Sequence, residues 1–289
     1  MKAGIDFARF TWDGGAAALG GLAGEAVTMA DEAGFSTIAA MDHFFQIPMV
    51  GEYTEPMLDG YTFLGFAAGR STRAKLQLMV TGVTYRHPGL LAKIVTTLDV
   101  LSGGRAILGI GAAWNHHEHL ALGVPFPSTS ERYERLDETL AICAQMWGDD
   151  NGPFHGTHYQ LTETLSSPVN VSTPGPEIMV GGMGPNKTLK LAARHAGAVN
   201  WFPIGHDAVA GLKARLAQHC EAEGTDVDAI RLTLMTFPPP PGGLDGWLND
   251  IEGYRALGFD EIYLAPASRD PRVDIETYAT EVLPRVAAM

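Results

Sequence analysis

The stretch that decides the fold is LDVLSGGRAILGIGAAWNHHE, at residues 98–118. It reads as the end of a helix, a tight turn at residues 102–104, and a buried strand at 106–110. The strand opens into a loop that begins Gly109-Ile110-Gly111 and continues with an aromatic residue, an amide and a carboxylate. Glycines at the carboxyl end of an apolar strand let backbone N–H groups approach a ligand closely, often a phosphate. The stretch therefore predicts a strand that ends in a ligand-binding loop.

A second loop of this kind, IMVGGMGPNK, occupies residues 178–187, roughly two βα units further along the chain. It precedes a helix, and the N–H groups and dipole at a helix N-terminus suit an anion. The residues expected to hold a phosphate there are Gly181, Gly182, Met183 and Gly184. Two such loops on one scaffold predict a large phosphorylated cofactor.

Short apolar strands alternate with amphipathic helices along the whole chain. The expected strands are residues 3–7, 36–41, 76–82, 106–110, 177–181, 198–202, 231–236 and 261–264. The expected helices include residues 24–33, 89–101, 129–147, 187–195, 208–223 and 246–257. Strands that are continuously apolar are buried on both faces, as in parallel sheets. Eight of them separated by helices predict a single α/β domain over residues 1–289, a (β/α)8 TIM barrel. A doubly wound sheet is the alternative, but the glycines and acidic residues are not in Rossmann order.

Two segments depart from a simple alternation of strands and helices. Residues 148–176 are too long and irregular for a barrel connection, which is typical of a functional insertion or lid. The run FPPPPGG at residues 237–243 predicts a stiff extended loop at the catalytic end of the barrel.

Composition excludes several functional classes. A formal net charge of −13 with no basic cluster argues against nucleic-acid and membrane-surface partners. The two cysteines lack the spacing of a metal site or redox pair, and no apolar run is long enough to span a bilayer. We therefore expect a cytoplasmic protein that acts on a small molecule.

Seven motifs along most of the chain resemble the bacterial luciferase-like superfamily of flavin and deazaflavin oxidoreductases. They are MDHF at 41–44, TGVTYRHP at 81–88, LDVLSGGR at 98–105, GIGAAWN at 109–115, FPSTSER at 126–132, GGMG at 181–184 and LAARHAGAVNW at 191–201. The branch that uses coenzyme F420 is the most similar, because of the Asp-His pair and the Thr-Gly-Val step. The resemblance implies a homodimer with the coenzyme across the carboxyl-terminal mouth of the barrel.

Asp42 and His43 are the candidate catalytic residues. They follow a predicted strand, at the barrel end where active sites of this fold lie. Histidine can relay a proton near neutral pH, and a neighbouring aspartate can bias its tautomer. The resemblance implies that the pair lies against the deazaflavin ring.

The resemblance also implies a non-proline cis peptide at Gly82–Val83, forming a bulge that supports the ring. An ordinary glycine at a strand end is the alternative there, and tight packing is the alternative for the glycines at 109–111. The complete set of candidate cofactor-binding residues is Asp42, Thr81, Gly82, Val83, Gly109, Gly111, Ala112, Ala113, Trp114, Asn115, Gly181, Gly182, Met183 and Gly184.

The chain departs from the family pattern at two neighbouring positions. Ala113 replaces a glycine of many relatives, and no glutamate stands near Ala112, where some sugar-phosphate dehydrogenases of the family place a catalytic one. This argues against glutamate-assisted sugar oxidation. His116 and His119 could share a helix face, but they lack the spacing of a His-Glu-x-x-His site, so we expect no metal.

These observations predict an oxidoreductase that transfers a hydride between coenzyme F420 and an unidentified small organic substrate. The first alternative is an FMN-dependent luciferase-like monooxygenase, which takes reduced flavin from a partner reductase and uses dioxygen. The second alternative is a flavin-binding relative without catalytic activity.

Overall fold

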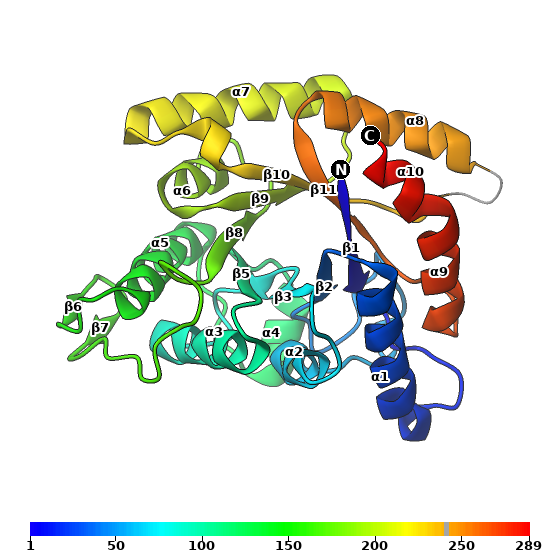
Figure 1. The fold of residues 1–289 in the computed structure, drawn as a ribbon. Helices are drawn as coiled ribbons and strands as arrows, with labels where there is room; N and C mark the ends of the chain where they lie inside the picture. The colour runs from blue at the N-terminus through cyan, green and yellow to red at the C-terminus, as the bar shows by residue number, and fades with distance from the viewer. Residues whose placement is uncertain (240–242) are drawn as a thin grey trace.

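Eight parallel strand positions close into a barrel ringed by helices (Figure 1) in the computed structural model, which describes residues 1–239 and 243–289. The barrel strands are β1 (Lys2–Phe7), β2 (Thr37–Ala40), β3 (Lys75–Leu78), β5 (Ala106–Gly111), β8 (Glu177–Gly181), β9 (Ala198–Trp201), β10 (Arg231–Met235) and β11 (Phe259–Leu264). Each pairs in parallel with the next, and β11 pairs with β1 to close the ring. The predicted TIM barrel is confirmed.

The strands are short and largely buried, as their apolar sequences predict. All six residues of β5 and all four of β2 and β9 are buried. The third strand position is interrupted: β3 ends at Leu78, and a two-residue strand β4 (Thr81–Gly82) resumes the pairing with β5. The break lies at the carboxyl end of the barrel, where it shapes the site described below.

Ten α-helices are described outside residues 240–242. Those close to the expected ranges are α3 (Pro88–Ser102), α5 (Thr129–Trp147), α6 (Thr188–His195), α7 (His206–Glu223) and α8 (Leu244–Ala256). The helix α1 (Ala16–Ala33) ends where expected but begins at Ala16 rather than at residue 24. Those not among the expected helices are α2 (Gly60–Ala68), α4 (His116–Leu122), α9 (Pro271–Thr277) and α10 (Leu283–Ala287). Within the described chain, no helix is long and apolar enough to span a membrane.

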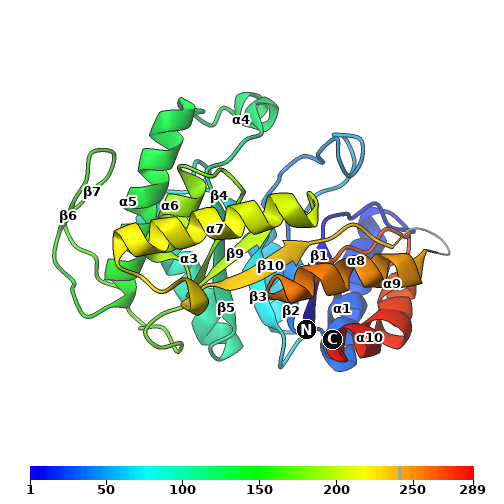
Figure 2. The same ribbon diagram turned by 90° about the horizontal axis from the view of Figure 1, so that it is seen from above.

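The segment at residues 148–176 contains a short hairpin of β6 (Phe154–His155) and β7 (Gln160–Leu161). Figures 1 and 2 both show the hairpin beside α5, at the side of the barrel. The Glu138 carboxylate on α5 accepts hydrogen bonds from the backbone N–H groups of Thr157, His158 and Tyr159. The segment is therefore anchored to a helix of the outer ring rather than placed over the barrel mouth.

Candidate active site

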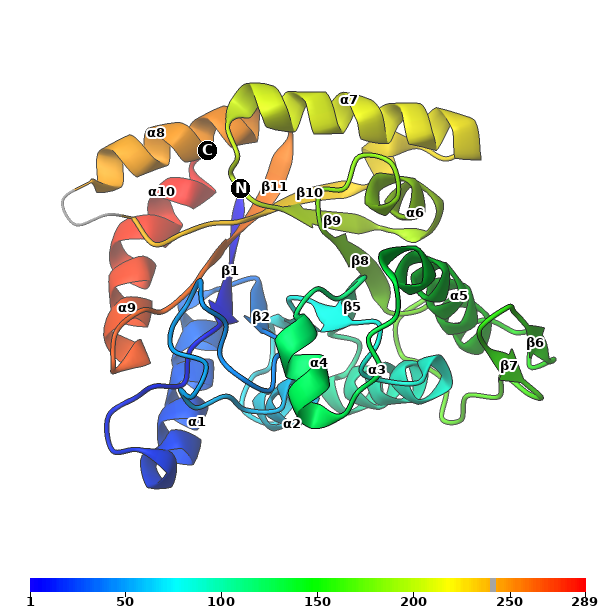
Figure 3. The same ribbon diagram turned by 180° about the vertical axis from the view of Figure 1, so that it is seen from behind.

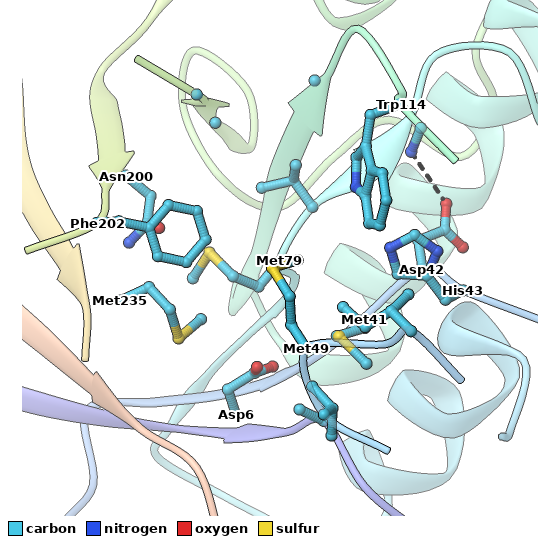
Figure 4. A pocket seen from close by; sticks show the side chains of 18 of the residues that line it. Asp6, Met41, Asp42, His43, Met49, Met79, Trp114, Asn200, Phe202 and Met235 are labelled. Carbon is cyan, nitrogen blue, oxygen red and sulfur yellow. Dashed lines mark hydrogen bonds between the residues drawn. The ribbon is translucent and has the colours of Figure 1, made fainter. Parts of the chain in front are cut away.

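A cavity of about 530 Å³ opens at the carboxyl ends of the strands. Figure 3 looks toward this end of the barrel, with α4 lying in front of β5. All eight strand positions, or the loops that follow them, contribute lining residues, and Figure 4 shows a large share of these side chains. Twelve of the candidate residues line the cavity: Asp42, His43, Thr81, Gly82, Gly111, Ala112, Ala113, Trp114, Gly181, Gly182, Met183 and Gly184.

The proline-rich loop after β10 also reaches the cavity, because Phe237 and Pro238 line it. This agrees with the predicted position of the 237–243 loop at the catalytic end, although residues 240–242 of that prediction lie outside the described residues. Residues 148–176, all of them described, contribute nothing to the lining.

Three of the candidate cofactor-binding residues lie outside the cavity lining. Val83 is 1% exposed and belongs to the hydrophobic core. Asn115 caps α4, where its side chain accepts a hydrogen bond from the N–H of Glu118. Gly109 lies beneath the mouth, where a Cβ atom would approach the Leu78 carbonyl oxygen to 2.1 Å. Gly109 is therefore required for tight packing against β3, which is the alternative to ligand binding given above.

The non-proline cis peptide lies between Met79 and Val80, so its prediction at Gly82–Val83 was wrong. The strand pairing shows why the bulge is not at Gly82: this residue remains in the sheet, where it pairs with Gly111 of β5. The interruption falls instead on the two residues between β3 and β4.

The side chain of Val80 occupies the space that two glycines leave open. A Cβ atom at Gly111 would lie 3.2 Å from a Val80 methyl group, and one at Gly181 would lie 2.9 Å from both methyl groups. The glycines at the ends of β5 and β8 therefore make room for the bulge after β3, as well as lining the cavity.

His43 is held by a buried glutamate, Glu118, which is not among the site residues expected from the sequence. The Nδ1 atom of His43 lies 2.9 Å from Oε2 of Glu118, whose side chain is fully buried. Asp42, the predicted tautomer-fixing neighbour, makes no hydrogen bond to His43 among the described residues. That prediction is corrected: a residue on α4, far away in sequence, contacts the imidazole ring.

The hydrogen bonds around Glu118 favour its ionised form. Its Oε1 accepts hydrogen bonds from the backbone N–H groups of Phe44 and Phe45, and its Oε2 accepts one from the Tyr85 hydroxyl group. Burial alone would raise the pKa of the Glu118 carboxyl, but the hydrogen bonds from His43, Tyr85 and Phe45 outweigh it and lower that pKa. An anionic Glu118 selects the His43 tautomer that carries its proton on Nδ1. The Nε2 atom of His43 is then a proton acceptor on a residue that lines the cavity.

Asp42 forms a buried ion pair with Arg86. The two guanidinium nitrogens lie 2.6 and 2.9 Å from the carboxylate oxygens, and the N–H of Gly82 donates to the same carboxylate at 3.3 Å. Burial raises the pKa of Asp42, while Arg86 and the Gly82 N–H act in the opposite direction. Asp42 thus ties the loop after β2 to the β4 backbone and to Arg86.

The histidines His116 and His119 of α4 contact other protein side chains and backbone groups. His119 is buried, and its ring nitrogens contact the Thr84 hydroxyl at 2.5 Å and the Asn115 carbonyl oxygen at 2.7 Å. His116 packs against Phe126. Across the described residues, no group of three or more histidine, cysteine or acidic side chains is placed to hold a metal ion.

The loop between β8 and α6 forms a polar end of the cavity. Gly182 has a φ of +115°, a conformation that L side chains rarely adopt. A Cβ atom at Gly184 would lie 2.7 Å from the Thr188 hydroxyl, which is hydrogen-bonded to the Tyr133 hydroxyl at 2.8 Å. Both hydroxyl residues line the cavity. Backbone N–H groups, two hydroxyl groups and the start of a helix together make a surface that fits a phosphate.

Comparisons with known proteins relate the chain to flavin and deazaflavin enzymes. The family model described as luciferase-like monooxygenase matches residues 12–239. The chain is 32% identical over 168 residues to an F420-dependent glucose-6-phosphate dehydrogenase of Beutenbergia cavernae, across 57% of this chain and 48% of that protein. It is 31% identical over 150 residues to an FMNH2-dependent dimethylsulfone monooxygenase of Pseudomonas putida, across 52% of this chain and 40% of that protein. The chain thus spans about half the length of these curated relatives.

The fold also matches a solved structure of an F420-dependent secondary alcohol dehydrogenase in complex with an F420-acetone adduct. The TM-score is 0.82, at 16% identity and over 99% of both chains. At this identity the likeness concerns the barrel and its connections.

Proposed function

This chain belongs to the luciferase-like monooxygenase family, and we propose that it transfers a hydride between coenzyme F420 and a small organic substrate. The observation that carries the proposal is the His43–Glu118 pair, which presents a proton acceptor to the cavity at the catalytic end of the barrel. The similarity to F420-dependent dehydrogenases supports the choice of coenzyme.

The lining residues fit a coenzyme with a flat ring and a phosphate-bearing side chain. Gly111 and Gly181 let the Val80 side chain reach the cavity wall, and Trp114 and Met79 offer further apolar surface. The loop at Gly182–Gly184, together with the Thr188 and Tyr133 hydroxyl groups, would hold the phosphate. When bound, coenzyme F420 supplies the carbon that accepts or donates the hydride.

The chemistry of this chain's own residues is proton transfer and positioning. In the oxidising direction, a hydride leaves a substrate C–H bond with both electrons, and the adjacent O–H proton passes to Nε2 of His43. Glu118 stabilises the imidazolium ion that results, and the reverse direction returns the same proton. The apolar walls exclude water from the reacting carbon.

The second candidate is an FMN-dependent monooxygenase, which the similarity to the dimethylsulfone monooxygenase favours. The third candidate is the flavin-binding relative without catalytic activity, which the absence of a carboxylate at Ala112 favours. The buried Glu118 weakens this argument, because it supplies a carboxylate to His43 from a different position.

A fluorescence titration of the purified protein with coenzyme F420 and, separately, with FMN tests the proposal. We expect selective binding of the deazaflavin with a dissociation constant in the micromolar range. His43→Ala should leave that binding within about threefold and reduce turnover by about two orders of magnitude or more. Preferential FMN binding with oxygen uptake on adding reduced FMN would refute the proposal in favour of the monooxygenase. Binding without turnover of any substrate would favour the third possibility.

A further inference from the structure

A second carboxyl group, separate from the His43–Glu118 pair, lies at the wall of the cavity. Asp6 is near the carboxyl end of β1, where it pairs with Ala39 of β2, and it is 2% exposed. It lines the cavity, and Figure 4 shows its carboxyl group among the side chains of Met235, Met79 and Met49.

Asp6 has no protein partner in the described part of the chain. No described residue donates a hydrogen bond to either carboxyl oxygen, and Oδ1 is buried without any partner. The contrast with the other buried acids is clear, since Asp42 is paired with Arg86 and Glu118 accepts four hydrogen bonds. A buried polar group without a partner carries a free-energy cost that a ligand can remove.

The surroundings of Asp6 favour its uncharged form. Arg9 is the one lysine or arginine among the described lining residues. Its guanidinium group donates to the Val50 carbonyl at 3.0 Å, and its Nε lies 3.4 Å from the Glu55 carboxylate, which balances its charge. Burial raises the pKa of Asp6 to about 7, and a protonated carboxyl group carries a hydrogen-bond donor.

We propose that Asp6 is a substrate-binding residue, whose O–H group donates a hydrogen bond to an acceptor atom of an uncharged and largely apolar substrate. The methionines around Asp6 fit the apolar part, because thioether side chains adapt to irregular shapes. A phosphorylated or carboxylate substrate would meet Asp6 without a free cation to balance its charge. The inference deepens the proposed function and rests on it, since it assigns a substrate class to the same cavity.

Three ring compounds of matched shape test the inference by calorimetric titration: cyclohexanone as the neutral acceptor, cyclohexylamine as the cation and cyclohexanecarboxylate as the anion. The wild type should bind cyclohexanone most tightly at low pH, with affinity about 30-fold weaker at pH 8.5 than at pH 5.5, because only the protonated acid donates. The other titratable or charged groups that line the cavity are Arg9, Asp42, His43, Tyr85 and Tyr133. They are common to all variants, so differences between variants report Asp6.

Two variants separate hydrogen bonding from shape. Asp6→Asn keeps a donor, and should bind cyclohexanone within about fivefold of the wild type at pH 5.5 with no pH dependence. Asp6→Leu lacks the donor, and should bind it at least about tenfold more weakly at pH 5.5. Unchanged coenzyme F420 binding in the same variants would show that the site is intact.

Each alternative outcome has a defined meaning. The inference is overturned if the wild type does not bind cyclohexanone, if Asp6→Leu binds it as the wild type does, or if cyclohexylamine binds more tightly and gains affinity as pH rises. Tight binding of cyclohexanecarboxylate would also overturn it. If coenzyme F420 binds in any of these cases, the proposed function still stands. If cyclohexanone behaves as expected and the coenzyme does not bind, the proposed function fails and the Asp6 site remains.

Discussion

Replacing Glu118 by glutamine should reverse the tautomer of His43. Oε1 of Glu118 accepts two backbone N–H groups, so the glutamine must keep its carbonyl oxygen at that position. Its NH2 group then faces Nδ1 of His43, where the carboxylate oxygen lies 2.9 Å away in the wild type. Because two donors cannot share that contact, His43 must accept at Nδ1 and carry its proton on Nε2. The variant would present a donor to the cavity in place of an acceptor.

The expected loss of activity follows from the charge that is removed. A carboxylate about 4 Å from an imidazolium ion stabilises it by about 4 kcal/mol at an effective dielectric constant of 20. Losing that stabilisation in the transition state for proton transfer corresponds to about three orders of magnitude in rate. Coenzyme affinity should change by less than about threefold, because Glu118 itself does not line the cavity.

Two measurements check this reasoning, and one needs no substrate. Nitrogen-15 NMR of the His43 ring should show the proton on Nδ1 in the wild type and on Nε2 in Glu118→Gln. Single-turnover hydride transfer, with any substrate that the enzyme accepts, gives the rate. Glu118→Ala is the matched control, since it removes the charge without supplying a donor to Nδ1. An unchanged tautomer, or a rate within threefold of the wild type, would refute the assigned role of Glu118.

Three further predictions concern stability. Asp6→Asn should remove much of the pH dependence of the unfolding free energy. A pKa of Asp6 raised from 3.8 to about 7 makes the wild type lose up to about 4 kcal/mol of unfolding free energy as pH rises from 4 to above 7. If urea unfolding shows the same change in unfolding free energy for the wild type and the variant over this range, the prediction is wrong. Ala113→Gly should stabilise the fold by up to about 1 kcal/mol, because Ala113 has a φ of +60°; a lower melting temperature would count against this. Arg86→Met should cost about 3–5 kcal/mol in urea unfolding by leaving the Asp42 carboxylate buried and unpaired, and adding Asp42→Asn should recover much of that loss; no recovery would place the cost outside the ion pair.

The barrel could be predicted from sequence because its signals are local. Continuous apolar runs mark the strands, and glycines at helix ends mark several stops, such as Gly34 and Gly103 in left-handed conformations. The helix α2 gives a weak sequence signal, because GYTFLGFAA is apolar nearly all round and contains two glycines. Its start has a local signal, since Asp59 accepts a hydrogen bond from the N–H of Thr62.

Glu118 shows why the site was harder to predict than the fold. Asn115 and Glu118 have the spacing of a helix cap, and Asn115 does accept the N–H of Glu118. That pattern predicts an exposed first turn, whereas the loop after β2 covers Glu118 completely. The contact joins residues 75 positions apart, so no periodicity or spacing in the sequence could indicate it.

The glycines at the ends of β5 and β8 illustrate how one residue type serves two purposes. From sequence they suggested a phosphate, because glycine permits the close approach of a ligand to the backbone. In the structure Gly111 and Gly181 admit the side chain of Val80, whereas the loop from Gly182 to Gly184 lies beside two hydroxyl groups and a helix start. The group that approaches a glycine can be a side chain of the same protein. Distinguishing it from a ligand requires knowing where the neighbouring strand lies, which the sequence does not tell. The phosphate assignment therefore rests on the loop after β8, and the glycines of β5 belong to the architecture that shapes the cavity.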